Sequence, residues 1–121
     1  MNTNHLQSTS LMPIIIRIKD KKDTLAMLTI KGYIHEAGYL AAHRKIHFLT
    51  KVPLNKQWKI THLPTGSNVG IIVSSKEKAI SCMIALARNF DWSFTDTKKL
   101  SDDKKKQMKE MIKTLNNQYK L

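Results

Sequence analysis

One segment near the middle of the chain constrains the fold more than any other. Residues 58–62 alternate between apolar and polar side chains, and residues 69–73 do so again. This period of two is that of a half-buried strand. The sequence PTGSN lies between them and is typical of a turn, because Pro64 fixes φ and Gly66 permits a left-handed conformation. The segment therefore predicts an antiparallel hairpin.

A second hairpin is predicted upstream, over residues 14–33. Residues 14–18 (IIIRI) place isoleucines on one face at period two, and β-branched side chains favour strands. The polar sequence DKKD at 20–23 predicts the turn, and residues 24–33 predict the second strand.

Residues 39–48 fit two patterns. Leu40 and Arg44 fall at helical spacing, whereas Leu40, Ala42 and Ile46 would share one face of a strand. A strand is favoured over a helix, because the segments on both sides are themselves predicted strands.

Two helices are predicted in the C-terminal half. Ser74 is expected to cap the first helix, with Glu77 completing a capping box, and this helix should end near Asn89. Ser101 is expected to cap the last helix, where Asp102 and its neighbour favour the positive end of the helix dipole. The apolar stripes of the two helices are Ile80, Met83, Ile84 and Ala87, and Met108, Met111, Ile112, Leu115 and Tyr119.

These elements together predict an α+β fold. It consists of a small, mainly antiparallel sheet of about four or five strands, including two hairpins, with two helices packed on one face. Between the helices, Phe90, Trp92 and Phe94 are expected to fold back over the edge of the core. Residues 1–12 are polar and lack periodicity, so we expect a flexible N-terminal arm followed by a single basic domain over 13–121.

The charge of the chain points to its partner class. Lys and Arg number 21 against 9 Asp and Glu, which gives a net charge of +12. Between Glu36 and Glu77 there is no acidic residue at all. A field of one sign favours a polyanion as the partner, so we expect binding to a nucleic acid or a nucleoprotein complex.

The basic side chains in and beside this acid-free stretch are the predicted binding surface. A sheet binds nucleic acid when Lys and Arg contact phosphates and aromatic rings stack on bases. Tyr39, Phe48 and Trp58 lie among these cations, and Trp58 and Phe48 fit the hydrophobic core better than a stacking role. The predicted nucleic-acid-binding residues, on one basic sheet face, are Arg44, Lys45, Lys51, Lys56, Lys59, Lys76 and Lys78. A secondary basic face on the last helix comprises Lys104, Lys105, Lys106, Lys109 and Lys113.

Catalytic and metal-binding patterns are weak by comparison. His43, His47 and His62 offer three imidazoles, but there is no HExxH motif, cysteine pair or second nearby carboxylate to complete a zinc site. We interpret these histidines as part of the basic face. Few carboxylates remain free for metal-dependent catalysis, and Cys82 lies beside the apolar stripe of a helix. No enzymatic activity, cofactor or metal is therefore expected.

The stretch 57–90, a hairpin that runs into a helix opened by SSKEKA, resembles the second half of a double-stranded-RNA-binding domain. In that family the basic start of the helix lies over phosphates of the duplex. The chain departs from the family upstream, where strands are predicted in place of its first helix, and it lacks the fuller lysine cluster at the helix start.

The leading interpretation is non-catalytic binding to nucleic acid with low sequence specificity, because no recognition-helix or zinc-finger signature is present. The alternative is a small phage or mobile-element inhibitor or adaptor that binds a host protein complex, for example in an anti-CRISPR role. A cytoplasmic location is expected from the single cysteine and the absence of a signal-peptide pattern. No membrane partner is expected, and the oligomeric state is left open.

Overall fold

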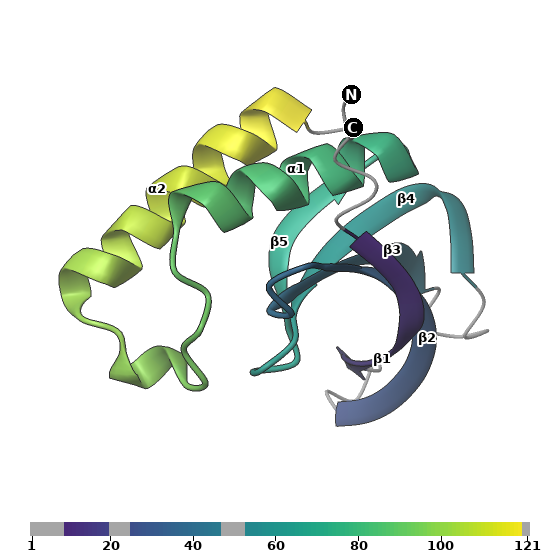
Figure 1. The fold of residues 1–121 in the computed structure, drawn as a ribbon, viewed down its shortest axis with the longest axis horizontal. Helices are drawn as coiled ribbons and strands as arrows, with labels where there is room; N and C mark the ends of the chain where they lie inside the picture. The colour runs from purple at the N-terminus through teal and green to yellow at the C-terminus, as the bar shows by residue number, and fades with distance from the viewer. Residues whose placement is uncertain (1–8, 20–24, 47–52, 120–121) are drawn as a thin grey trace.

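The computed structural model describes residues 9–19, 25–46 and 53–119. Within them the chain forms an antiparallel five-stranded sheet followed by two α-helices (Figure 1). Strand order in the sheet follows chain order, so each strand pairs with its neighbours in sequence. The elements are β1 (Thr9–Lys19), β2 (Leu25–His35), β3 (Leu40–Ile46), β4 (Pro53–His62), β5 (Ser67–Val73), α1 (Lys76–Asn89), the short 3-10 helix η2 (Thr97–Lys99) and α2 (Asp102–Tyr119).

This architecture confirms the predicted α+β class. β1 with β2 and β4 with β5 form the two predicted hairpins. In the ambiguous stretch 39–48, residues 40–46 form strand β3, and residues 47 and 48 lie outside the described residues. β1 begins earlier than predicted: residues 9–12, assigned to the arm, lie in this strand because they pair with residues 32–35 of β2. Residues 1–8 of the predicted arm and the predicted turn at 20–23 lie outside the described residues.

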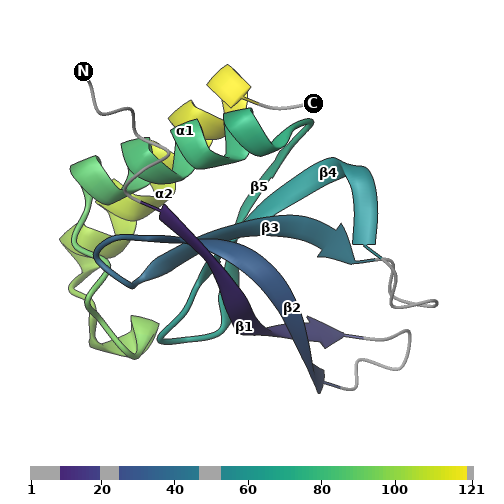
Figure 2. The same cartoon turned by 45° about the vertical axis from the view of Figure 1, so that its right-hand side comes forward.

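The sheet is strongly curved, and its two faces differ (Figures 1 and 2). α1 packs across β3, β4 and β5, and α2 packs against α1 and β5. We call this side the helix face. On the opposite side, the inner face, β1 curls over so that Ile14 and Ile16 join Ala41 and Ile46 of β3 in one buried cluster. Side chains alternate between the two faces along each strand.

The helix face carries the main core. α1 starts after Ser75, whose hydroxyl accepts the backbone N–H of Lys78. The predicted cap at Ser74 was wrong by one residue, because Ser75 has the extended backbone of a cap while the Ser74 hydroxyl accepts from the Lys78 side chain. Ser101 caps α2 as predicted, by accepting the N–H of Lys104. Among the described residues, neither helix combines the length and apolar character needed to cross a bilayer.

The aromatic segment between the helices closes one edge of this core, as predicted. The Trp92 ring is 4% exposed, and its indole N–H donates to the carbonyl of Leu86 at 2.8 Å. Phe94 stacks on the His62 ring with a centroid distance of 4.2 Å. Phe90 meets Trp92 edge-on at 5.2 Å. The segment thus links the end of α1 to the end of β4.

Gly32 allows β1 to approach β3 across β2. A Cβ at this position would lie 2.7 Å from Cδ1 of Ile14 and 3.3 Å from the carbonyl oxygen of Ala42. The first distance is shorter than a van der Waals contact, so a side chain here would require the Ile14 side chain to shift. Glycine therefore lets β1 and β3 pack closely at this crossing.

Candidate anion-binding surface

Two cations lie over two aromatic rings on the helix face. The guanidinium carbon of Arg44 is 6.0 Å from the centroid of the Trp58 ring, and Nζ of Lys76 is 5.3 Å from that of Tyr33. The centroids of the two rings are 6.2 Å apart. Because ring faces attract cations, this pair of rings contacts one cation from β3 and one from α1, although the two cations are distant in sequence.

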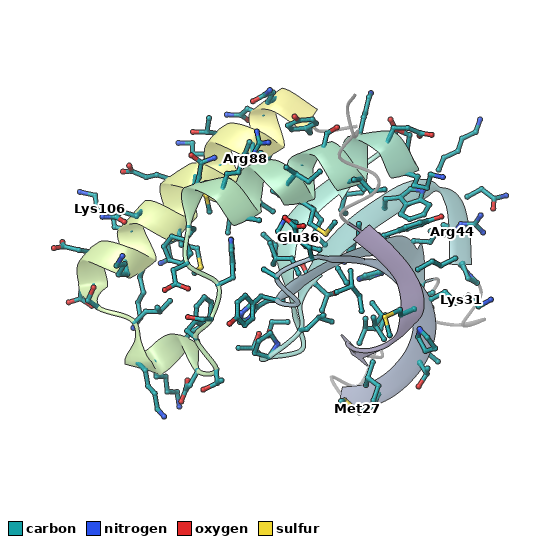
Figure 3. All side chains as sticks on the ribbon, viewed as in Figure 1. Met27, Lys31, Glu36, Arg44, Arg88 and Lys106 are labelled. Carbon is teal, nitrogen blue, oxygen red and sulfur yellow. The ribbon has the colours of Figure 1, made fainter. Side chains whose placement is uncertain are left out.

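Lys31 extends this arrangement. It lies two residues before Tyr33 on β2, which places it on the same face, and both residues line the same groove as Arg44. Figure 3 shows Lys31 and Arg44 on the same side of the molecule. We call Lys31, Arg44 and Lys76 the cationic row. Sequence reasoning missed Lys31, although its period-two spacing from Tyr33 was a signal that could have found it.

Two other predicted contacts lie on neighbouring elements. Lys56 is exposed on β4, in the part where pairing with β3 shifts register. Lys78 is exposed in the first turn of α1, with Nζ 3.3 Å from Oγ of Ser74. Lysines at this helix start add to the partial positive charge of the N-terminus. Lys51 lies outside the described residues.

Lys45 and Lys59 are separated from the cationic row by the sheet itself. Lys59 follows Trp58 on β4 and pairs with His43 and Ile72, so its side chain lies on the inner face. Burial, and secondarily the charge of Lys45, lower the pKa of Lys59 from its usual value. The prediction of one basic sheet face is therefore wrong in this respect: Arg44 and Lys59 occupy opposite faces because adjacent positions in a strand alternate.

The secondary basic face lies on α2. Lys104, Lys106, Lys109 and Lys113 are exposed and Lys105 is half-buried. In Figure 3, Lys106 lies on the helical layer, at the other end of the view from Lys31 and Arg44. Lys106 therefore lies apart from Lys31 and Arg44.

His43 is a buried structural residue and not part of a basic face. Its side chain is 2% exposed, with Nδ1 2.8 Å from the carbonyl oxygen of Arg44 and Nε2 2.7 Å from Oγ1 of Thr61. Because a carbonyl only accepts, Nδ1 carries the proton, and the Thr61 hydroxyl donates to Nε2. Burial lowers the pKa of His43, a carbonyl hydrogen bond partly opposes this, and the charge of Lys59 lowers it further.

His62 has the opposite tautomer on the opposite face. Nε2 lies 2.7 Å from the carbonyl oxygen of Trp92, so Nε2 carries the proton, and Nδ1 accepts from Oγ1 of Thr65 at 2.8 Å. Burial lowers the pKa of His62. The interpretation of these histidines as part of the basic face is thus wrong for His43 and His62, whose ring nitrogens are used within the fold. His47 lies outside the described residues.

β2 and β3 separate soon after they meet. Two residue pairs join them, Tyr33 with Ala42 and Ile34 with Ala41, whereas eleven join β1 to β2. The same register would place Lys31 opposite Arg44, but that pair does not form. A slot of about 490 Å³ lies between the diverging strands. Among the described residues none that lines it is acidic, and the lining includes Leu28, Ile30 and Ile46 as well as Lys31, Tyr33, Arg44 and Trp58.

Cys82 is enclosed by the core. It is 0% exposed, and burial raises the pKa of its thiol to about 11. A thiol of this kind is unreactive at neutral pH, because the thiolate is the nucleophile. Within residues 9–19, 25–46 and 53–119, no group of three His, Cys, Asp or Glu side chains is placed to hold a metal ion.

Comparison with known proteins adds no relative to this description. Searches against family models, curated proteins and solved structures each found no match to the chain. The resemblance of 57–90 to a double-stranded-RNA-binding domain rests on the order of hairpin and helix alone. The structure has β1, β2 and β3 ahead of that stretch, where a helix would be needed.

Proposed function

We propose that this protein is a non-catalytic nucleic-acid-binding protein that contacts the phosphate backbone through the cationic row. The observation that carries the proposal is the placement of Arg44 and Lys76 over neighbouring aromatic rings, with Lys31 beside them. Cations positioned in this way lose less side-chain entropy on binding than freely moving lysines. Phosphates are the natural ligand for such a group in a chain of net charge +12.

The same geometry supports low sequence specificity. Trp58 is 9% exposed and covered by Arg44, and Tyr33 is half-buried under Lys76. These rings support the cations and leave little aromatic surface for bases to stack on. Contacts to phosphates position a nucleic acid but carry no direct sequence information. We also propose a cytoplasmic location, supported by the single, buried, unpaired thiol of Cys82.

The test compares two triple variants with the same loss of charge. Lys31→Gln, Arg44→Gln and Lys76→Gln are combined in one, and Lys104→Gln, Lys106→Gln and Lys109→Gln in the other. Binding to a labelled duplex and a labelled single strand is measured by anisotropy over a range of salt concentrations. We expect the first variant to reduce the slope of log affinity against log salt by about two to three, since each phosphate contact contributes about 0.7–0.9.

The α2 variant is the control for net charge. It should retain most of the affinity and slope of the parent protein, because its exposed lysines belong to α2, whereas the cationic row belongs to β2, β3 and α1, and Lys106 lies away from Lys31 and Arg44. Equal losses of affinity in the two variants would contradict the proposed surface, because they would show that binding depends only on the total charge of the protein. Undetectable binding at about 50 mM salt would reject the nucleic-acid function itself.

The inhibitor or adaptor role is a second candidate function. One observation favours it: the slot between β2 and β3 has an apolar side and a cationic side. Such a slot suits a polypeptide that carries both apolar and acidic side chains.

A further inference from the structure

The slot combines two features that a polypeptide strand would complete. Beyond the pair Tyr33 and Ala42, β2 and β3 no longer bond to each other. β2 remains fully paired with β1, and β3 remains paired with β4. Each strand therefore keeps one edge of main-chain N–H and C=O groups facing the slot, as at the edge of an open sheet. Such an edge is a template for an added strand.

The side chains around the slot differ between its two sides. Leu28, Ile30 and Ile46 belong to the inner-face cluster. Lys31 and Arg44 lie on the helix face beside Tyr33 and Trp58. Successive side chains of a strand point to opposite faces. A strand in the slot would thus direct every second side chain to apolar residues and the others to cations.

We propose that the slot binds an extended segment of a partner protein in which acidic and apolar residues alternate, by addition of that segment to the edge of β2. The apolar side chains would pack on Leu28, Ile30 and Ile46, and the carboxylates would pair with Lys31 and Arg44. Leu11 is 52% exposed and lines the slot, so it offers the segment further apolar contact.

Charge excludes the chain's own strands as a good occupant. None of the five described strands contains a single Asp or Glu. Residues 1–8 and 47–52 also lack acidic residues. A second copy, or one of these segments, would bring no carboxylate to Lys31 and Arg44, and in most registers would bring further cations. The complementary partner is therefore a different, acidic polypeptide.

This site goes beyond nucleic-acid binding and does not depend on it. Because the added strand would use Lys31 and Arg44, which also belong to the cationic row, the two ligands would compete for the protein. An acidic partner strand would then release bound nucleic acid. Peptide binding itself is measured with no nucleic acid present, so failure of either proposal is seen separately.

The probe is a seven-residue peptide in which Ile and Glu alternate, as long as residues 25–31 of β2, which precede the point where β2 meets β3. Its binding to the full chain is measured by anisotropy of a labelled peptide. Main-chain pairing is measured by amide hydrogen exchange of residues 28–31. We expect binding, together with slower exchange at those amides of 28–31 that face β3. We also expect a loss of at least about tenfold when the peptide is N-methylated at every second residue, since this removes the donors of one edge.

A charge-reversal variant provides a second test, because a gain of affinity for an oppositely charged peptide cannot result from poor folding. The double variant Lys31→Glu, Arg44→Glu should bind the Ile–Glu peptide at least about tenfold more weakly and should gain affinity for a matched Ile–Lys peptide. Peptide binding with no change in exchange at 28–31, or binding insensitive to N-methylation, would overturn the proposal. Protection of the amides that face β3 in the free chain, in a dimer, or by a single-stranded oligonucleotide in place of the peptide would also overturn it.

Discussion

The buried pair of His43 and Thr61 provides the sharpest test of the fold. Thr61 is 1% exposed, and its hydroxyl donates to Nε2 of His43 at 2.7 Å. Thr61→Val keeps the shape but leaves the Nε2 lone pair buried without a donor. An unsatisfied buried polar group costs about 1–3 kcal/mol, so we expect a loss of about 2 kcal/mol in the free energy of unfolding. For a domain of this size that lowers Tm by about 6–8 °C.

The assay is urea and thermal unfolding at pH 7.5, followed by tryptophan fluorescence. His43→Leu, alone and combined with Thr61→Val, completes a double-mutant cycle. Removing both polar partners costs less than the sum of the single changes, so the coupling free energy should be at least about 1 kcal/mol. Thr61→Ser, which retains the hydroxyl, is the control. A Thr61→Val protein within about 0.5 kcal/mol of the parent, or a purely additive cycle, would refute the deduced hydrogen bond.

Two further predictions follow from buried titratable groups. His43 and His62 have pKa values below the usual 6.5. As the pH is lowered, these histidines therefore take up protons in the unfolded chain before they do so in the folded protein. The free energy of unfolding should have its full value above about pH 6.5 and should decrease as the pH falls to 5. Urea titrations across this range measure it, and a constant value would contradict neutral histidines. Cys82, with its thiol pKa near 11 and no exposure, should react with a thiol reagent at pH 8 only after urea unfolds the protein. Rapid labelling of the native chain would show that the core opens locally.

The sequence predicted the elements well because their signals are local. Alternation and turn chemistry located both hairpins, and the apolar stripe of α1 lies in the core, with Ile80 and Met83 at 2% and 0% exposure. Trp58 proved to be buried, as the preferred core interpretation had it. The cap of α1 was misplaced by one residue because two serines stand in a row, and only backbone geometry distinguishes them.

The candidate site was harder to predict because it depends on relations between strands. The period of two shows which residues of one strand share a face. It shows that Arg44 and Lys59 lie on opposite faces only when it is combined with the pairing of β3 with β4. The slot arises where a two-strand ladder ends early, and no composition signal marks that point. The histidines were misinterpreted because each has a partner that is distant in sequence: Thr61 is eighteen residues from His43, and Trp92 is thirty residues from His62.

The order of the strands in the sheet also affects how the chain folds. Since every strand pairs with a sequence neighbour, most pairing closes short loops, which favours rapid folding. Each hairpin joins strands that are neighbours in the chain, and hairpins form on a timescale of microseconds. The two residue pairs between β2 and β3 then join one hairpin to the rest of the sheet. We expect formation of this short junction to limit the rate of folding, so changes at Gly32 or Ala42 should slow folding more than changes within either hairpin.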